Sequence, residues 1–415
     1  MEDTLLTAID VGTTKICTLV AELIDVDSYE ILGVGTVPAR GMRKGVIVDV
    51  EQASAAIGES IDQAERSSGY QIGAAFVSLA GAHISSVNSH GVVGITGHRG
   101  IDEDDVDRAL DAAQAIAIPH NREVMHIIPR GFEVDGQDGV RSPLGMYGFR
   151  LEVEAHIVTA AKTSVQNLTK CIEHSGVVVE QFVLNPLAAA EVALNETERE
   201  MGVVVCDIGG GTTDMAIFIE GNVWHSMVLS VGGQHITSDL AHGLRLPIEI
   251  AEGIKCDHGH AWQRQVEAHE HINVRPFGSD TPIQISRAEL AHIVEARAEE
   301  IFTLVLQEIK RSGYDGLLPA GIVLTGGSAR LPGLREIAGD VLGLPVRVAE
   351  PANLRGLIDN ISGPEYATTV GLLNWAARET IFRDTPRSSN GSSERTKRST
   401  GGGWLEFFRR LTPMS

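Results

Sequence analysis

The sequence predicts an α/β protein of two lobes that face each other, with a small α+β subdomain inserted into the first lobe. Residues 5–22 and 203–220 repeat one pattern, in which an apolar run leads through an aspartate and a glycine turn with two threonines into a second apolar run. Residues 84–161 change to short strand-like segments around one helix. The repeat predicts one hairpin in each lobe, and the change in character predicts the insertion.

The later copy, 203–214, reads Val-Val-Val-Cys-Asp-Ile-Gly-Gly-Gly-Thr-Thr-Asp. Its apolar run is typical of a buried strand. The glycines let the backbone turn tightly and approach a ligand, and successive N–H groups in such a turn form an anion-binding nest. Asp207, at the strand end, is placed to hold a hydrated magnesium ion against a phosphate. Taken alone, the pattern fits a glycine-rich turn between core strands equally well.

The earlier copy shows that the pattern is a repeat. Asp10 matches Asp207, and Gly12-Thr13-Thr14 matches Gly211-Thr212-Thr213. A strand-like segment follows each turn, whereas a Walker loop or a dinucleotide-binding loop opens into a helix. We therefore expect two hairpins that grip one polyphosphate, with Lys15 within reach of a phosphate or, alternatively, exposed on a strand.

Composition limits the classes of function. The chain has 415 residues, 43% of them hydrophobic, and a net charge of −21. That charge argues against a general nucleic-acid binder, which needs a basic face. The four cysteines lie far apart, as expected for free thiols in a reducing cytosol. The first residues, Met-Glu-Asp-Thr, lack the basic and apolar regions of a signal peptide, and no apolar run is long enough to span a membrane.

Helices and strands alternate between the two hairpins. We expect helices over 50–69 and 164–174 and strands over 29–37, 74–79 and 177–184. The small-residue segment after Leu184 predicts a helix with Asn185 as its N-cap and Pro186 at its first position. In the insertion we expect a helix from Ile101 to about 117, with edge-type strands before it and strands over 123–128, 132–134 and 151–158 after it.

The second lobe continues with two expected helices. Glu252 and Lys255 are three residues apart and share a helical face, where a solvent-exposed ion pair is the alternative role. Ser286 and Glu289 fit a capping box for a helix that ends at Gly313. A buried strand then meets Gly326 and Gly327, which leave a flat surface for a purine and its ribose, before a helix with Pro332 near its first turn. A last helix rich in small residues begins around 362–364.

The C-terminal segment is different in composition. Residues 384–403 have almost no apolar side chains and read as a flexible linker. The segment 404–415 then forms an amphipathic pattern with apolar and basic faces, typical of a helix in a membrane interface. From position 383 onward there are seven basic and three acidic residues, so this end alone attracts anionic lipid. Docking on its own domain or on a partner is the alternative. The candidate membrane-binding residues are Trp404, Leu405, Phe407, Phe408, Arg409, Arg410 and Leu411.

The order of these motifs resembles the actin-like ATPase superfamily, and within it the FtsA family of bacterial cell-division proteins. The resemblance covers residues 5 to about 378 and includes the insertion, the segment that begins at Val231-Gly-Gly-Gln-His, the segment Gly321-Ile-Val-Leu-Thr-Gly-Gly and the amphipathic end. It implies an actin-like fold with duplicated mixed sheets, ATP and magnesium as ligands, and self-association into filaments. It also implies tethering of FtsZ to anionic lipid of the inner membrane, as a peripheral protein at the cytoplasmic face of the septum.

The resemblance assigns roles residue by residue. The first phosphate motif is matched by Asp10, Gly12, Thr13, Thr14 and Lys15, the second by Asp207, Gly209, Gly210, Gly211, Thr212 and Thr213, and the adenosine motif by Gly326, Gly327 and Ser328. Glu252 and Lys255 fall where chaperones of the superfamily contact the nucleoside, and Asp10 and Asp207 would hold magnesium through water. At Asn185 those chaperones carry a glutamate beside the attacking water. Since asparagine cannot take a proton, we expect at most a slow ATPase.

The resemblance also implies a domain layout. The first lobe would comprise 1–83, 162–192 and 364–383, the insertion 84–161, the second lobe 193–231 and 301–363, and its small subdomain 232–300. The FtsZ C-terminal peptide would dock on the small subdomain, and the insertion would serve filament contacts and later division proteins. Two alternatives remain at this point, a PilM-like scaffold for pilus assembly and a sugar-kinase-type phosphotransferase.

Overall fold

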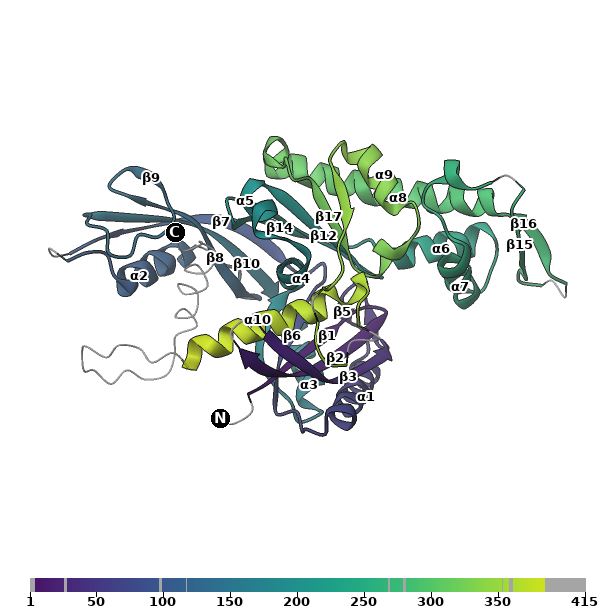
Figure 1. Ribbon diagram of the computed structural model, residues 1–415, viewed down its shortest axis with the longest axis horizontal. Coiled ribbons are helices and arrows are strands. Elements are labelled where there is room, and N and C mark those ends of the chain that lie inside the picture. The colour runs from purple at the N-terminus through teal and green to yellow at the C-terminus, as the bar shows by residue number, and fades with distance from the viewer. Residues whose placement is uncertain are drawn as a thin grey trace.

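The computed structural model describes residues 4–25, 28–96, 99–116, 118–267, 269–278, 281–352, 354–357 and 361–384. Two mixed sheets, one in each lobe, stack around a pair of helices at the middle of the molecule, and two smaller units project from the second lobe's ends in opposite directions (Figure 1). The membrane-binding residues proposed from the sequence, 404–411, and the linker from 385 onward lie outside the described residues.

The sheet of the first lobe has the strand order β11-β6-β1-β2-β3. Its central strand β1 runs antiparallel to β2 and parallel to β6, so the turn between β1 and β2 lies at the edge where β6 and β11 also end. The strands are β1 (Leu5–Val11), β2 (Lys15–Asp25), β3 (Ser28–Pro38), β6 (Ala74–Leu79) and β11 (Val178–Leu184). A short hairpin of β4 (Met42–Arg43) and β5 (Val46–Ile47) follows β3.

The sheet of the second lobe copies this arrangement. Its order is β14-β13-β12-β17-β18, with β12 antiparallel to β13 and parallel to β17. Its strands are β12 (Val203–Ile208), β13 (Thr213–Ile219), β14 (Asn222–Leu229), β17 (Ile322–Thr325) and β18 (Val346–Val348). The repeat seen in the two hairpins therefore extends to the whole sheet, and the prediction of two lobes with duplicated mixed sheets is confirmed.

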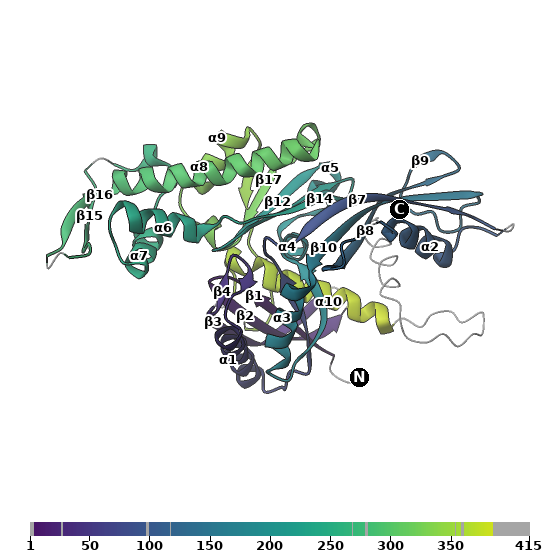
Figure 2. The same ribbon diagram turned by 180° about the vertical axis from the view of Figure 1, so that it is seen from behind.

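Two helices rich in small residues lie between the sheets, α4 (Asn185–Ala193) and α10 (Ala367–Asp384) (Figures 1 and 2). They approach each other closely because Gly371 has no side chain. A Cβ at this position would overlap the carbonyl oxygen of Ala188. Alternate residues of β12 pack into different hydrophobic cores. Val203 and Val205 pack toward α4 and α10, and Val204 packs toward the outer helices. Both helices thus form a middle layer that belongs to both lobes.

Amphipathic helices cover the outer faces. On the first lobe these are α1 (Val50–Ser68), which ends at Gly69 in a left-handed conformation (φ 79°), and α3 (Lys162–Glu173). On the second lobe they are α8 (Arg287–Ser312) and α9 (Leu334–Leu342) (Figure 2). The short helix α5 (Glu196–Met201) connects α4 to β12. Single 3₁₀ turns lie at Gln263–Gln265, Asp315–Leu317, Gly327–Arg330 and Pro364–Tyr366.

The insertion is a four-stranded sheet with its own core and one helix. Its strand order is β7-β10-β8-β9, built from β7 (Ser85–Gly94), β8 (Arg122–Val134), β9 (Gln137–Val140) and β10 (Arg150–Ala161), with α2 (Glu103–Gln114) on one face. At the other end of the molecule, α6 (Gly233–Gly243), α7 (Ile248–His258), β15 (His271–Val274) and β16 (Ile283–Ser286) form the second projecting unit (Figure 1).

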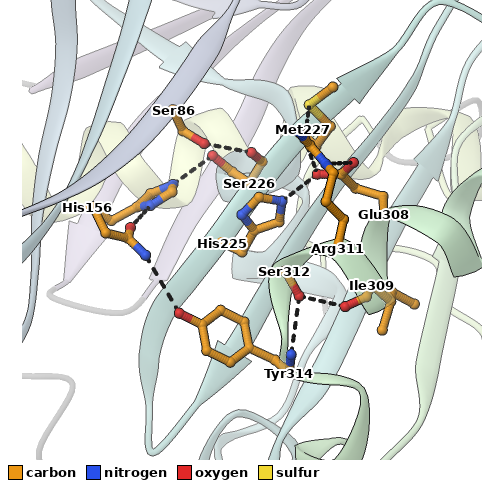
Figure 3. Close-up of polar contacts among 11 residues, drawn as sticks. Ser86, His156, His225, Ser226, Met227, Glu308, Ile309, Arg311, Ser312 and Tyr314 are labelled. Atoms are coloured by element: carbon orange, nitrogen blue, oxygen red, sulfur yellow. Dashed lines mark hydrogen bonds and ion pairs between the residues drawn. The ribbon is translucent and has the colours of Figure 1, made fainter.

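The base of the insertion contacts both lobes through buried histidines. On the second lobe's side, His156 of β10 bonds the hydroxyl of Ser226 through Nε2 at 2.8 Å and Asn88 Oδ1 through Nδ1 at 2.7 Å (Figure 3). On the first lobe's side, His126 of β8 accepts a hydrogen bond from the backbone N–H of Leu184 at 3.1 Å. The insertion follows the first lobe in sequence but is therefore fixed to both lobes in space.

Several local predictions need correction. Asn185 is not an N-cap: β11 runs directly into α4, Leu184 takes the cap position, and Asn185 is the first helical residue. Ser286 does cap α8, but its hydroxyl accepts from the N–H of Ala288 at 3.2 Å, and no reciprocal bond from Glu289 makes a capping box. The helix of the insertion begins at Glu103 because Asp102 and Asp105 form the capping box there.

Three further boundaries differ from the sequence prediction. Pro332 precedes α9, which starts at Leu334 after the 3₁₀ turn Gly327–Arg330. The strands expected over 123–128 and 132–134 are one continuous strand, β8, because its pairing with β10 continues on both sides of a bulge at Arg130. Over the described ranges, no helix has the length and hydropathy that crossing a membrane requires.

Candidate functional site

The turns of the two equivalent hairpins meet face to face. A Cβ on Gly211 would lie 2.5 Å from Thr13 Oγ1, and a Cβ on Gly210 would overlap the methyl group of Thr14. Thr13 in turn accepts a hydrogen bond from the N–H of Gly45 at 3.0 Å. Only glycine allows this approach of one lobe's backbone to the other lobe's side chains. The structure thus brings the two motifs together as the repeat predicted.

Asp10 and Asp207 occupy equivalent positions near the ends of β1 and β12, and each is only 7% exposed. Burial raises the pKa of Asp10, although nearby Lys15 opposes the shift. Burial likewise raises the pKa of Asp207 to about 6, against the lowering effect of a hydrogen bond from Thr368. The negative charge of Asp10 also raises the pKa of Asp207. Two such buried carboxyl groups favour a cation or hydrogen-bond donors beside them.

Two buried side-chain oxygens at the sheet edges that carry these carboxylates lack a hydrogen-bond donor among the described residues. They are Oδ1 of Asp214, which lies opposite Asp207 in the β12–β13 pair, and Oδ1 of Asn185. Asn185 follows β11 at the same sheet edge as Asp10. Unpaired buried acceptors are costly. A hydrated magnesium ion would supply both charge and O–H donors, so the donor set fits the expected ion.

The third glycine motif completes this side of the site. Gly326 has φ 85°, and a Cβ there would overlap Oδ1 of Asp207. Ser328 donates from its hydroxyl to the carbonyl of Gly209 at 3.1 Å, and the N–H groups of Gly233 and Gln234, at the start of α6, donate to the carbonyls of Gly209 and Gly210 at 2.9 and 2.8 Å. The second hairpin is therefore held by both the third motif and α6.

Glu252 and Lys255 lie next to this motif. Their side chains form an ion pair at 2.7 Å, and Lys255 also donates to the carbonyl of Gly233 at 3.3 Å. A Cβ on Gly233 would lie 2.5 Å from the hydroxyl of Ser328 and 3.6 Å from Nζ of Lys255. Glu252 and Lys255 therefore lie adjacent to the proposed adenosine motif. They also form the ion pair on one helical face that was the alternative role.

The structure directs Lys15 to the chain that leads into α10. Its ammonium group donates to the carbonyl of Glu365 at 2.7 Å and lies 3.5 Å from the centre of the Tyr366 ring. Contact with a phosphate would compete with these interactions, and it stays a prediction. Beside it, a cavity of about 600 Å³ opens between the lobes, bordered by Arg330, Gly363, Glu365 and Tyr366 together with Val34, Thr36, Gln63 and Ser362.

Sequence reasoning missed three residues at the centre of the site. They are Thr368, Thr369 and Asp214. Thr368 donates to Asp207, Thr369 donates to Asp10, and Asp214 accepts a hydrogen bond from the predicted Thr212 at 2.8 Å. The sequence could have indicated Asp214, because it occupies the position in the second hairpin that Lys15 occupies in the first. The sequence could not have indicated Thr368 and Thr369, because the pattern of a helix does not show which distant carboxylates its hydroxyl groups contact.

Comparison with known proteins follows this geometry. The profile of the family described as "Cell division protein FtsA" matches residues 204–371, and that of the "SHS2 domain inserted in FTSA" matches residues 81–159. The cell division protein FtsA of Pseudomonas aeruginosa is 44% identical over 375 residues, which cover 90% of each chain. The chain belongs to the FtsA family. The FtsA protein of Bacillus subtilis is 40% identical and covers 89% of this chain and 83% of its own.

Solved structures agree on the actin-like fold of this FtsA-family chain. A PilM–PilN type IV pilus biogenesis complex matches with a TM-score of 0.66 at 15% identity, over 90% of this chain and 98% of that one. MreB5 of Spiroplasma citri bound to ADP matches with a TM-score of 0.53 at 16% identity, over 92% and 97% of the two chains. Because these identities are low, the structures show the fold alone. Membership in the FtsA family assigns the chain to cell division rather than to pilus assembly or sugar phosphorylation.

Proposed function

We propose that this FtsA-family protein binds magnesium-ATP between its two hairpins, assembles into filaments, and anchors FtsZ filaments to the cytoplasmic face of the membrane at the division septum. The observation that carries the proposal is the meeting of the two hairpin turns over the buried pair Asp10 and Asp207. A polyphosphate between the turns would join the two lobes, which explains why a structural protein would retain such a site.

The chain's own groups account for the binding. Backbone N–H groups around Gly209–Gly211 and Gly12 would bind phosphate oxygens, and Asp10 and Asp207 would hold magnesium through its water molecules. When bound, magnesium neutralises phosphate charge. Glu252, Lys255 and Ser328 would contact the nucleoside beside Gly327. The MreB5 neighbours were solved with ADP and with AMPPNP, and their shared fold supports a nucleotide in the equivalent place.

Hydrolysis is expected to be slow. Asn185 is buried at the same sheet edge as Asp10, and its amide can orient a water molecule without accepting its proton. General-base catalysis, which contributes about 10²- to 10⁴-fold in rate, is therefore missing at this position. Bound nucleotide would then set the relative position of the lobes and so the ability of the protein to polymerise. Rapid ATP hydrolysis would not be needed for this role.

The tail supplies the membrane contact in this proposal. Burying Trp404, Phe408 and Leu411 in a bilayer interface would contribute at best about 2 kcal/mol each. One tail therefore binds weakly and reversibly, and stable attachment requires many tails on one filament. The FtsZ C-terminal peptide would dock on the unit formed by 232–300, while the insertion would contact neighbouring protomers and later division proteins.

Calorimetry with the full chain tests the nucleotide site directly. We expect ATP to bind in the presence of magnesium and more weakly when EDTA removes the ion, because phosphate charge would then meet two buried carboxyl groups. Absence of ATP binding, or binding that is unchanged by Asp207→Asn and Asp10→Asn, would contradict the proposed site.

A further inference from the structure

Helix α10 carries two adjacent buried threonines that reach the two equivalent aspartates. Thr368 Oγ1 donates to Oδ2 of Asp207 at 2.6 Å, and Thr369 Oγ1 donates to Oδ2 of Asp10 at 3.2 Å. The threonines are 4% and 0% exposed. Successive residues of an α-helix are about 100° apart around its axis. One hydroxyl therefore points to each lobe, and a single helix contacts the carboxylates of both.

These bonds replace the interaction that threonine usually makes in a helix. A helical threonine hydroxyl commonly bonds the carbonyl four residues earlier, which here belongs to Pro364 for Thr368 and to Glu365 for Thr369. Those carbonyls already accept from elsewhere: that of Pro364 from the N–H of Gly326 at 3.0 Å, and that of Glu365 from Nζ of Lys15 at 2.7 Å. The start of α10 and the 3₁₀ turn Pro364–Tyr366 before it are thus joined to the third glycine motif, to the first hairpin and to both carboxylates.

Helix α10 is also held firmly along its length. Gly371 lies against the backbone of Ala188, so that no side chain fits between α10 and α4. Further along, Arg378 forms an ion pair with Glu191 of α4. Side chains on a packed helix hold a fixed geometry better than side chains on loops. The two hydroxyls therefore present donors whose positions depend on where α10 lies between the lobes.

We propose that Thr368 and Thr369 are positioning residues, through which α10 orients both magnesium-bearing carboxylates at once. The proposal rests on the proposed function, because it concerns the same magnesium-ATP site. It requires that the magnesium-dependent part of ATP affinity falls when either hydroxyl is removed, while the magnesium-independent part stays. It also makes α10, the last described helix before the tail, sensitive to occupation of the site.

The test measures ATP affinity of the full chain in magnesium and in EDTA, for wild type, Thr368→Val and Thr369→Val. Valine keeps the shape of threonine and removes only the hydroxyl. We expect each variant to lose about 10-fold or more of the magnesium-dependent gain, because a hydrogen bond to a charged group contributes about 1.5–3 kcal/mol. Affinity in EDTA should stay within about 2-fold by the same reasoning, since no ion then needs oriented ligands. Thr18→Val is the matched control, because Thr18 is a fully buried threonine of the first lobe whose hydroxyl pairs with Ser60 at 2.8 Å.

If a valine variant does not fold, a second pair of variants tests the effect of the Thr368 hydroxyl group alone. Thr368→Ser and Thr368→Ala both lose the methyl group, and only serine keeps the donor. Serine should retain the magnesium-dependent gain and alanine should lose it. Equal behaviour of the serine and alanine variants, or a full magnesium gain in the valine variants, overturns the positioning role while leaving the site itself intact. If wild type binds no ATP in magnesium, the proposed function fails instead.

Discussion

Gly211 of the second hairpin lies directly against Thr13 of the first, with room for a hydrogen atom and none for a methyl group: an added Cβ would come 2.5 Å from Thr13 Oγ1. At this point the two lobes touch through their most similar segments. We expect this contact to set the width of the proposed phosphate site.

We predict that Gly211→Ala pushes the two hairpins apart and weakens magnesium-ATP binding by at least about 10-fold, at a cost to stability of about 1–3 kcal/mol, as for other overpacked contacts. Calorimetry and thermal unfolding measure the two effects. Gly316→Ala is the control, because a Cβ there meets no atom within 4 Å. Equal ATP affinity in Gly211→Ala and Gly316→Ala would show that the contact does not define the site.

Asn185 allows a kinetic prediction. Phosphate release by the wild-type protein should be far slower than about 10 per second, the median for enzymes. Asn185→Ala should change that rate by less than about 3-fold, because asparagine offers no general base whose loss would cost 10²-fold or more. A release assay in the presence of lipid and FtsZ checks both values. A large fall in Asn185→Ala would instead show that the amide takes part in turnover.

The buried histidines of the insertion predict a dependence of stability on pH. Burial, reinforced by neighbouring positive groups, lowers the pKa of His156 to about 3, and burial lowers that of His126 to about 4. In the unfolded chain both pKa values return to about 6.5. As pH falls below 6.5, the unfolded chain therefore binds protons that the folded protein excludes, and each histidine lowers the free energy of unfolding by about 1.4 kcal/mol per pH unit.

Urea unfolding of the wild type and of His156→Gln at pH 7.5, 6.5, 5.5 and 5.0 isolates one of these contributions. Glutamine keeps a donor and an acceptor toward Asn88 and Ser226 but does not titrate. Between pH 6.5 and 5.0 the wild type should lose about 2 kcal/mol more than the variant. Parallel pH profiles would mean that His156 is not held neutral at the contact with the second lobe.

Local sequence patterns predicted the parts of this fold that short segments determine. The repeated hairpins at Asp10 and Asp207, the helix that ends at Gly69 and the small-residue helix that contains Gly371 all follow from residues within one or two turns of each other. The similarity of the two lobes followed because the hairpin motif is repeated. Family resemblance then supplied the actin-like arrangement, which the comparisons confirm.

Most of the missed features depend on distant contacts. The hydroxyl of Thr368 could have bonded its own helix, and only the position of Asp207, far away in the chain, decides otherwise. Asn185 looks like a cap in sequence, but a strand that enters the helix without a loop leaves no place for one. The attachment of the insertion to the second lobe through His156 and Ser226 was likewise invisible, because a polar residue in a strand does not reveal what covers it.

In the proposed function, this FtsA-family chain carries FtsZ to a membrane through its amphipathic end. Co-sedimentation of FtsZ with vesicles containing phosphatidylglycerol, in magnesium-ATP, tests it most directly when the full chain is compared with a chain that lacks residues 404–415. We predict that FtsZ sediments with the vesicles only when the full chain is present, and that FtsZ without its C-terminal peptide stays in solution. If the truncated chain brings down as much FtsZ as the full chain, the account is contradicted.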